Sequence, residues 1–186
     1  INIPAAAILT AAATGTADID ADIVLNGGTL DINEDTSVTS SSTITHTTGS
    51  IIDIADTKTL TYEGTAINID ALILTLTSAG TAYFTNTNAL ILNHVNSRLL
   101  ITGSITINNV SVTANSAGGD GIDVDSGDAI ISDLYASADP RVDVAGGATL
   151  TIGNSFSVTS NATLTVSGAG TLTLGDIILF ASLDID

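Results

Sequence analysis

Short runs that alternate apolar and polar residues recur along the whole chain, and this rhythm constrains the fold more than any other feature. Residues 29–32 read Thr-Leu-Asp-Ile, and residues 149–152 read Thr-Leu-Thr-Ile. Such alternation places one face of a strand in a core and the other in solvent. Gly, Asn, Asp and Ser lie between the runs and favour turns there. The pattern therefore predicts an all-β chain of short strands.

The spacing of these runs indicates a repeat. The tetrapeptide Ala-Leu-Ile-Leu at residues 71–74 returns at residues 89–92, a shift of 18 residues. Near the C-terminus, successive apolar centres lie about seven residues apart, so that three runs make one coil of roughly 20 residues. In a solenoid each coil buries its inner face against the next. The spacing therefore predicts a single parallel β-solenoid. A β-sandwich, which would need longer strands, is the alternative.

Two stretches carry a resemblance to known families. Residues 105–114, Ile-Thr-Ile-Asn-Asn-Val-Ser-Val-Thr-Ala, and residues 119–133 resemble the coils of pectate-lyase-type parallel β-helices. Residues 147–174 are similar to the coils of filamentous-haemagglutinin-type adhesins. The resemblance implies a right-handed parallel β-helix, a fold that is often found on extracellular proteins.

The N-terminal stretch differs in composition from the rest of the chain. Pro4 near its start, several Ala within it and Gly15 at its end suit a short helix that caps the solenoid. An extended arm that pairs with another subunit is the alternative. We therefore expect an N-terminal arm or cap at residues 1–16 and a β-solenoid domain at residues 17–186.

The charge balance limits the partners that this chain can have. Twenty acidic residues against three basic ones give a formal net charge of −17, which disfavours nucleic acid and anionic lipid. The chain has no Cys, so neither a disulfide nor a thiolate metal site is expected. It begins at Ile1 and contains no Met, so we expect an extracellular or cell-surface protein that is processed from a precursor. No apolar run reaches the roughly 20 residues that span a bilayer, so no membrane span is expected.

Two groups of carboxylates are candidate calcium ligands. Asp18, Asp20 and Asp22 alternate along one predicted strand, and alternation would place Asp123 and Asp125 on one outward face. Carboxylates at this spacing repel one another, and a bound calcium ion would relieve the repulsion. The alternative is a solvated acidic face that discourages aggregation. No other cofactor is expected.

The resemblance to pectin-degrading enzymes raises the question of catalysis. It implies a Gly-His-Gly turn and an Arg-x-Lys motif, or a catalytic Arg or Lys beside calcium. Here His46 lies in Thr-His-Thr, His94 lies in Asn-His-Val, and the single Lys58 is far in sequence from the acidic coil. We therefore expect no enzymatic activity. A β-helix that binds or cleaves glycans is the alternative.

Threonine pairs suggest a further alternative. Thr-x-Thr units recur, among them Thr59/Thr61, Thr149/Thr151 and Thr171/Thr173. Such pairs order water on β-solenoid ice-binding proteins, which this chain resembles in composition. Ice binding requires the pairs to stack in register on one face, whereas threonine is a good outward residue in any strand.

The leading hypothesis concerns the ends of the solenoid. The C-terminal run, residues 171–186, is apolar and has no polar cap, and an open end invites strand addition. Head-to-tail contacts that do not close into a ring grow a fibre. We therefore expect a homopolymer, either an extracellular filament or an adhesin stalk that presents a glycan or other surface ligand. The expected assembly residues are Ile3, Ile8, Leu9, Ile177, Ile178, Leu179 and Phe180.

Overall fold

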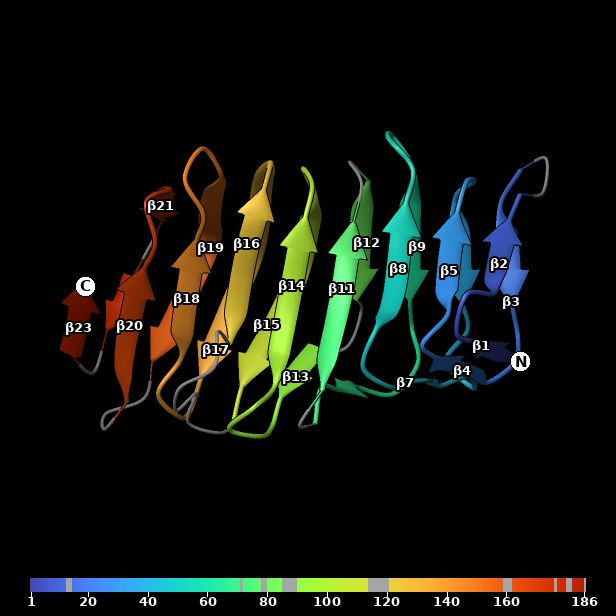
Figure 1. The fold of residues 1–186 in the computed structure, drawn as a ribbon, viewed down its shortest axis with the longest axis horizontal. Coiled ribbons are helices and arrows are strands. Elements are labelled where there is room, and N and C mark those ends of the chain that lie inside the picture. The colour runs from blue at the N-terminus through green and yellow to red at the C-terminus, as the bar shows by residue number, and fades with distance from the viewer. Residues whose placement is uncertain are drawn as a thin grey trace.

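The computed structural model describes residues 1–12, 15–70, 72–77, 80–84, 90–113, 121–158, 162–175, 177–179 and 182–185, the last two ranges by their backbone alone. Most of the described residues lie in strands and none lies in a helix, which confirms the all-β prediction. Accordingly, the described part holds no helix of the length and apolarity needed to cross a membrane. The strands stand side by side along one axis, and the two termini lie at opposite ends of it (Figure 1).

One long face of the molecule is a nine-stranded sheet, whose strands form the front row in Figure 1. Its strands, in spatial order, are β2 (Ile8–Ala11), β5 (Thr29–Ile32), β8 (Ser50–Ile54), β11 (Ile73–Thr77), β14 (Arg98–Thr102), β16 (Ile122–Ser126), β18 (Arg141–Val144), β20 (Thr163–Ser167) and β23 (Ser182–Ile185). Spatial order follows chain order, with two other strands between successive members over most of its length. This is the connectivity of a coil that returns to the same face once in every turn.

The second face is formed by an eleven-stranded sheet that also turns a corner. Its main path contains β3 (Ala17–Ile19), β6 (Thr36–Val38), β9 (Thr59–Tyr62), β12 (Thr81–Phe84), β15 (Thr106–Val112), β17 (Asp128–Ala136), β19 (Thr149–Val158) and β21 (Thr171–Leu174). Strand β15 pairs with β12 through its first residues and with β13 (Leu90–Leu92) through its last residues. The long strands β15, β17 and β19 therefore belong to two faces at once.

The third face begins as a separate sheet of three strands, β1 (Asn2–Pro4), β4 (Ile23–Asn26) and β7 (Ile44–His46). Farther along, the same face is formed by β10 (Ile67–Asn68), β13, the second halves of the long strands and β22 (Ile177–Leu179). The strand pairs are parallel. The chain is thus a parallel β-solenoid of about seven turns, consistent with the right-handed coil that the resemblance implied.

The register of the strands sets the length of a coil, and it does not match the 18-residue shift of the Ala-Leu-Ile-Leu tetrapeptide. Leu74 in β11 pairs with Leu99 in β14, whereas Leu90 lies in β13 on the third face. Inward-pointing residues of the nine-stranded sheet stack directly on one another, at separations of 20 to 25 residues. The stack runs through Leu9, Leu30, Ile52, Leu76, Ile101, Val124 and Val144. From Leu30 to Val144 every member is at most 2% exposed. Because each coil buries its apolar row against the rows above and below, the alternation in sequence becomes a continuous core.

Three aromatic side chains interrupt this aliphatic core. Tyr62, Phe84 and Phe156 are completely buried. The rings of Tyr62 and Phe84, which stack on neighbouring coils, meet edge to face with their centroids 5.9 Å apart. The interior is therefore built mainly of Ile, Leu, Val and Ala, and three of the six aromatic residues also lie within it.

The N-terminal stretch is extended and belongs to the first coil. Strand β1 pairs with β4, and β2 pairs with β5, so residues expected to form an arm or cap lie in the same sheets as the rest of the solenoid. The helical alternative is not adopted in the described residues. Backbone pairing with the second coil overrides the helix propensity of the alanines.

Candidate assembly interface

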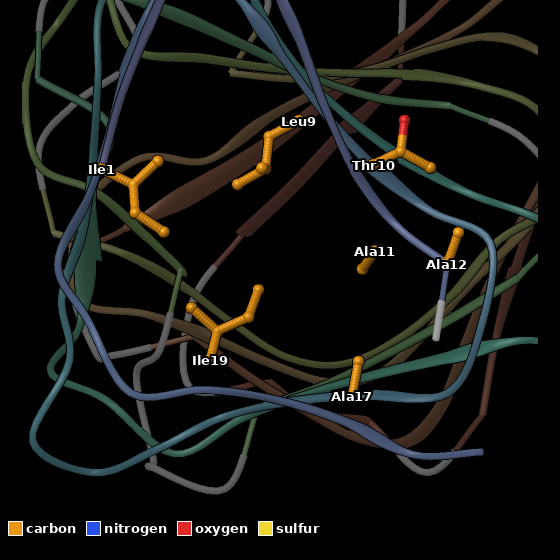
Figure 2. Close-up of a pocket in the computed structure, with 7 residues that line it drawn as sticks. All are labelled: Ile1, Leu9, Thr10, Ala11, Ala12, Ala17 and Ile19. Atoms are coloured by element: carbon orange, nitrogen blue, oxygen red, sulfur yellow. The ribbon is translucent and has the colours of Figure 1, made fainter. Parts of the chain in front are cut away.

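The first coil leaves an apolar hollow open at the N-terminal end of the solenoid. The hollow has a volume of about 420 Å³. Figure 2 shows the side chains of Ile1, Leu9 and Ile19 turned toward one another around it. Its described lining consists of Ile1, Leu9, Thr10, Ala11, Ala12, Ala17 and Ile19. Apart from Thr10, these residues are apolar.

The hollow is the interior of the solenoid seen in cross-section. Leu9 stacks on Leu30, and Ile19 occupies the position that corresponds to Val38 in the next coil. Leu30 and Val38 are completely buried, whereas Leu9 and Ile19 are half-buried. The same kinds of side chain are therefore covered one coil further along and uncovered here, because no coil lies above the first one in the described structure.

The backbone of the first coil is also open on one side. In the described sheets β1 pairs only with β4, β2 pairs only with β5, and β3 pairs only with β6. At the opposite end, β21, β22 and β23 each pair with one strand. Unpaired strand edges are templates for another strand, and here they lie beside an apolar opening.

The residues expected to form the interface lie in different environments. Ile3 is only 3% exposed and stacks on Leu25, so it is part of the core rather than of an open surface. Ile8 is 66% exposed and points outward from β2, while Leu9 lines the hollow. The backbone of Ile177, Ile178 and Leu179 forms β22, which pairs with β19. Their side chains, and the whole of Phe180, lie outside the described residues.

Sequence reasoning missed Ile1, Ala17 and Ile19 as lining residues. Ile19 lies in the Asp18–Asp22 segment, which drew attention for its carboxylates alone. The alternation in that segment is itself the signal, because Asp18 and Asp20 point outward and Ile19 must then point inward. Its position on the first coil leaves it uncovered.

The N-terminal carboxylates accept hydrogen bonds from hydroxyl groups of the next coil. The Asp20 carboxylate accepts from Ser41 Oγ at 2.7 Å and from Thr39 Oγ at 2.9 Å. These two bonds, that of Ser41 first, lower the pKa of Asp20. Asp22 Oδ1 accepts from the backbone N–H and the hydroxyl of Thr43, at 2.9 and 2.8 Å. Asp18 is exposed. Two of the three proposed calcium ligands thus tie neighbouring coils together.

The second acidic pair is separated by a local irregularity. Asp123 is 2% exposed and forms an ion pair with Arg98, whereas Asp125 is exposed. The register of β16 against β14 shifts just after Ile101, so Asp125 has no direct partner there. The expected shared face of Asp123 and Asp125 is therefore replaced by two different environments. Among the described residues, no three His, Cys, Asp or Glu side chains are grouped so that they could hold a metal ion.

Threonines stack in a row on the outer side of the eleven-stranded sheet, but the row is incomplete. Thr59, Thr81 and Thr106 are successive partners, Ile130 takes the next position, and the row then resumes. Beside Thr81, the second position of the pair is Tyr83. Among the described strands of this face, complete Thr-x-Thr pairs stack on one another only where residues 149–151 meet residues 171–173. The described strands therefore do not form the extended row of stacked pairs that ice binding requires.

Two of the three basic residues, Lys58 and Arg98, form ion pairs in the wall of the solenoid. Lys58 Nζ lies 2.8 Å from Glu34 Oε2 on the preceding coil, which raises the pKa of Lys58. Arg98 forms the ion pair with Asp123. Both cations thus hold neighbouring coils together.

No family model, no curated protein and no solved structure matches this chain.

Proposed function

We propose that this chain is a non-enzymatic structural subunit that joins copies of itself head to tail, as an extracellular filament or adhesin stalk. The observation that carries the proposal is the uncovered apolar cross-section of the first coil, bordered by unpaired strand edges. The occupant that we propose for it is the last coil of a second copy.

The strand topology supports this occupant. Within the chain, each coil is joined to the next by parallel pairing, and the first and last coils offer edges of the same kind. On the nine-stranded sheet, β23 of one copy would lie beside β2 of the next, and on the third face β22 would lie beside β1. On the eleven-stranded sheet, one strand position would stay empty between β21 of one copy and β3 of the next. Such a contact is heterologous and does not close on itself, so it grows a fibre.

Apolar burial opposes charge repulsion at this joint. Complete burial of an aliphatic side chain contributes roughly 1.5–3 kcal/mol. Ile1 is 52% exposed, and Leu9 and Ile19 are half-buried, so each has surface left to bury. The net charge of −17 on each subunit acts against association. Salt or calcium, which screens that charge, should therefore promote assembly.

A pair of matched substitutions tests the proposal. Leu9→Lys places a charge at the rim of the hollow, and Ile130→Lys places the same charge at a 40% exposed position in the middle of the solenoid. We expect wild type and Ile130→Lys to form filaments in salt or calcium, as seen by light scattering and negative-stain microscopy, and Leu9→Lys to remain monomeric. A wild-type chain that stays monomeric at high concentration under these conditions contradicts the proposal. Filaments that are unaffected by Leu9→Lys contradict the proposed joint.

A further inference from the structure

Among the described strands, the hydrogen-bonded ladder of the third face is interrupted between β7 and β10. Strand β4 pairs with β7, and β10 pairs with β13, but β7 and β10 are not paired, although parts of them approach within 8 Å. The Tyr62 hydroxyl occupies part of the interruption: it accepts a hydrogen bond from the Ile44 N–H at 3.1 Å and donates one to the Thr65 carbonyl at 2.6 Å. A side chain thus replaces the backbone ladder here. We call the boundary between residues 43–46 and residues 65–70 the seam.

A polar hollow of about 260 Å³ lies along the seam. It is lined by residues 43–46 of one coil and by Thr65, Ala66, Asn68 and Asp70 of the next. A hollow of this size and polarity holds water. The two coils are therefore joined less tightly here than where a continuous ladder connects them.

His46 lines this hollow and also belongs to the core. Ile3, Leu25 and His46 are successive partners on the third face, so the imidazole continues an apolar stack. The side chain is 8% exposed, and neither ring nitrogen has a hydrogen-bond partner among the residues that the structure describes. An ordinary core residue would be apolar at this position.

Burial keeps the imidazole neutral at neutral pH. It lowers the pKa of His46, while the nearby backbone of Thr47 and Asn68 and the Asp70 carboxylate oppose that change. Asp70 is the other titratable group that lines the hollow, and it accepts a hydrogen bond from Asn93 Nδ2 at 2.7 Å. Tyr62 lies on the Ile44 side, and Asp22 is held by Thr43. Strands β4 and β10 contain no titratable residue.

We propose that the seam is a proton-operated switch: protonation of His46 separates β7 from β10 and opens the solenoid between these two coils. A charged imidazolium is unstable in an apolar stack, and the Thr47 and Asn68 backbone and the Asp70 carboxylate offset that cost only in part. It gains solvation, and closer contact with the carboxylate on the rim, by moving outward. Because no backbone ladder joins β7 to β10, this face can open without breaking one, while the coils stay joined through β8–β11 and β9–β12 on the other two faces. This switch does not depend on head-to-tail assembly.

The pH range follows from linkage. The closed form binds fewer protons than the open form, in which the imidazole has its ordinary pKa of about 6.5. Acid therefore favours opening, and the opening equilibrium constant rises by up to about tenfold for each pH unit below about 6.5. The opening equilibrium constant stops rising once the pH falls below the pKa of His46 in the closed form. Above about pH 7 the seam stays closed.

Hydrogen exchange of the full chain between pH 5 and 8 tests the switch, once intrinsic exchange rates have been corrected for. The chain contains only two histidines, and His94 is exposed, so His94→Gln is a matched control. We expect exchange of residues 41–50 and 62–70 to accelerate in acid in wild type and in His94→Gln. In His46→Leu, which restores an apolar stack, the corrected exchange should be independent of pH.

Two results would overturn the proposal. One is acid-accelerated exchange at the seam that persists in His46→Leu. The other is hydrogen exchange at the seam of His94→Gln that does not change with pH while the imidazole resonances of His46, the one remaining histidine, report its protonation. The second test uses a variant with no substitution at the seam, so it still tests the proposed switch if His46→Leu fails to fold.

Discussion

The two halves of the solenoid are joined in different ways. In the first coils the three faces are made of separate short strands, and β4 meets β7 over three residues. In the later coils β17 and β19 run around a corner and pair over eight residues, with one register shift. The same repeat thus gives a continuous wall in one half and a wall interrupted by a seam in the other. We therefore expect continuity of the ladder, more than burial alone, to decide which half is more stable.

The largest expected effect comes from a cavity in the continuous half. Phe156 is completely buried where β19 meets β17, and Phe156→Ala should lower the free energy of unfolding by about 3–5 kcal/mol. Leu25→Ala in the three-stranded sheet should cost about 2–5 kcal/mol. We expect Phe156→Ala to shift one global transition in urea denaturation followed by circular dichroism. Leu25→Ala should instead produce an early, partial transition. A single transition of the same kind in both variants would show that the two halves unfold together and would contradict the proposed difference between them.

A smaller effect is expected at the seam. Tyr62→Phe keeps the buried ring but removes the hydroxyl that joins the Ile44 N–H to the Thr65 carbonyl. Leaving these groups without a partner costs about 1–3 kcal/mol. Tyr83→Phe, at a side chain that is 48% exposed, is the control and should change nothing. Hydrogen exchange should accelerate around the seam in Tyr62→Phe alone; equal exchange in both variants would show that the hydroxyl does not stabilise the seam.

The smallest effect concerns Asp20 and separates two pH ranges. Hydrogen bonds from Ser41 and Thr39 lower the pKa of Asp20 in the folded chain, so its contribution to stability is complete above about pH 4, near the ordinary pKa of an aspartate. That contribution is lost as the pH falls through the lowered value. The melting temperature of Asp20→Asn should be slightly below that of wild type at pH 7, and the difference should shrink as the pH falls below about 4. A difference that grows in acid would contradict this assignment. The seam, by contrast, should begin to respond at a higher pH, about 6.5.

The fold was predictable because its cause is local and repeated. Alternation in runs such as residues 29–32 sets which side chains point inward, and a spacing near 20 residues sets the coil. Asn26-Gly27 shows the limit of this reasoning. That dipeptide is typical of a hairpin turn. Here Asn26 ends β4, and Gly27 begins the corner that leads to β5 in the next sheet of the coil.

The details of the candidate sites depend on register, which a single sequence does not contain. Nothing in Thr45-His46-Thr47 indicates that the imidazole stacks beneath Leu25, because that contact joins residues 21 apart in an imperfect repeat. Likewise, the one-residue shift beside Asp125 cancels the alternation that had placed it with Asp123. The open hollow could be inferred from the fold, since any first coil exposes one side of its core.

The spacing of subunits along a filament tests the central claim most directly. Nine strands per subunit at about 4.8 Å each give an axial repeat of roughly 43 Å when β23 of one copy adjoins β2 of the next. Electron microscopy of filaments formed in salt or calcium should therefore show a rod one solenoid wide with this repeat, and fibre diffraction should show a 4.8 Å spacing along the axis. A monodisperse monomer, or a fibre whose solenoids lie across its axis, would contradict head-to-tail assembly.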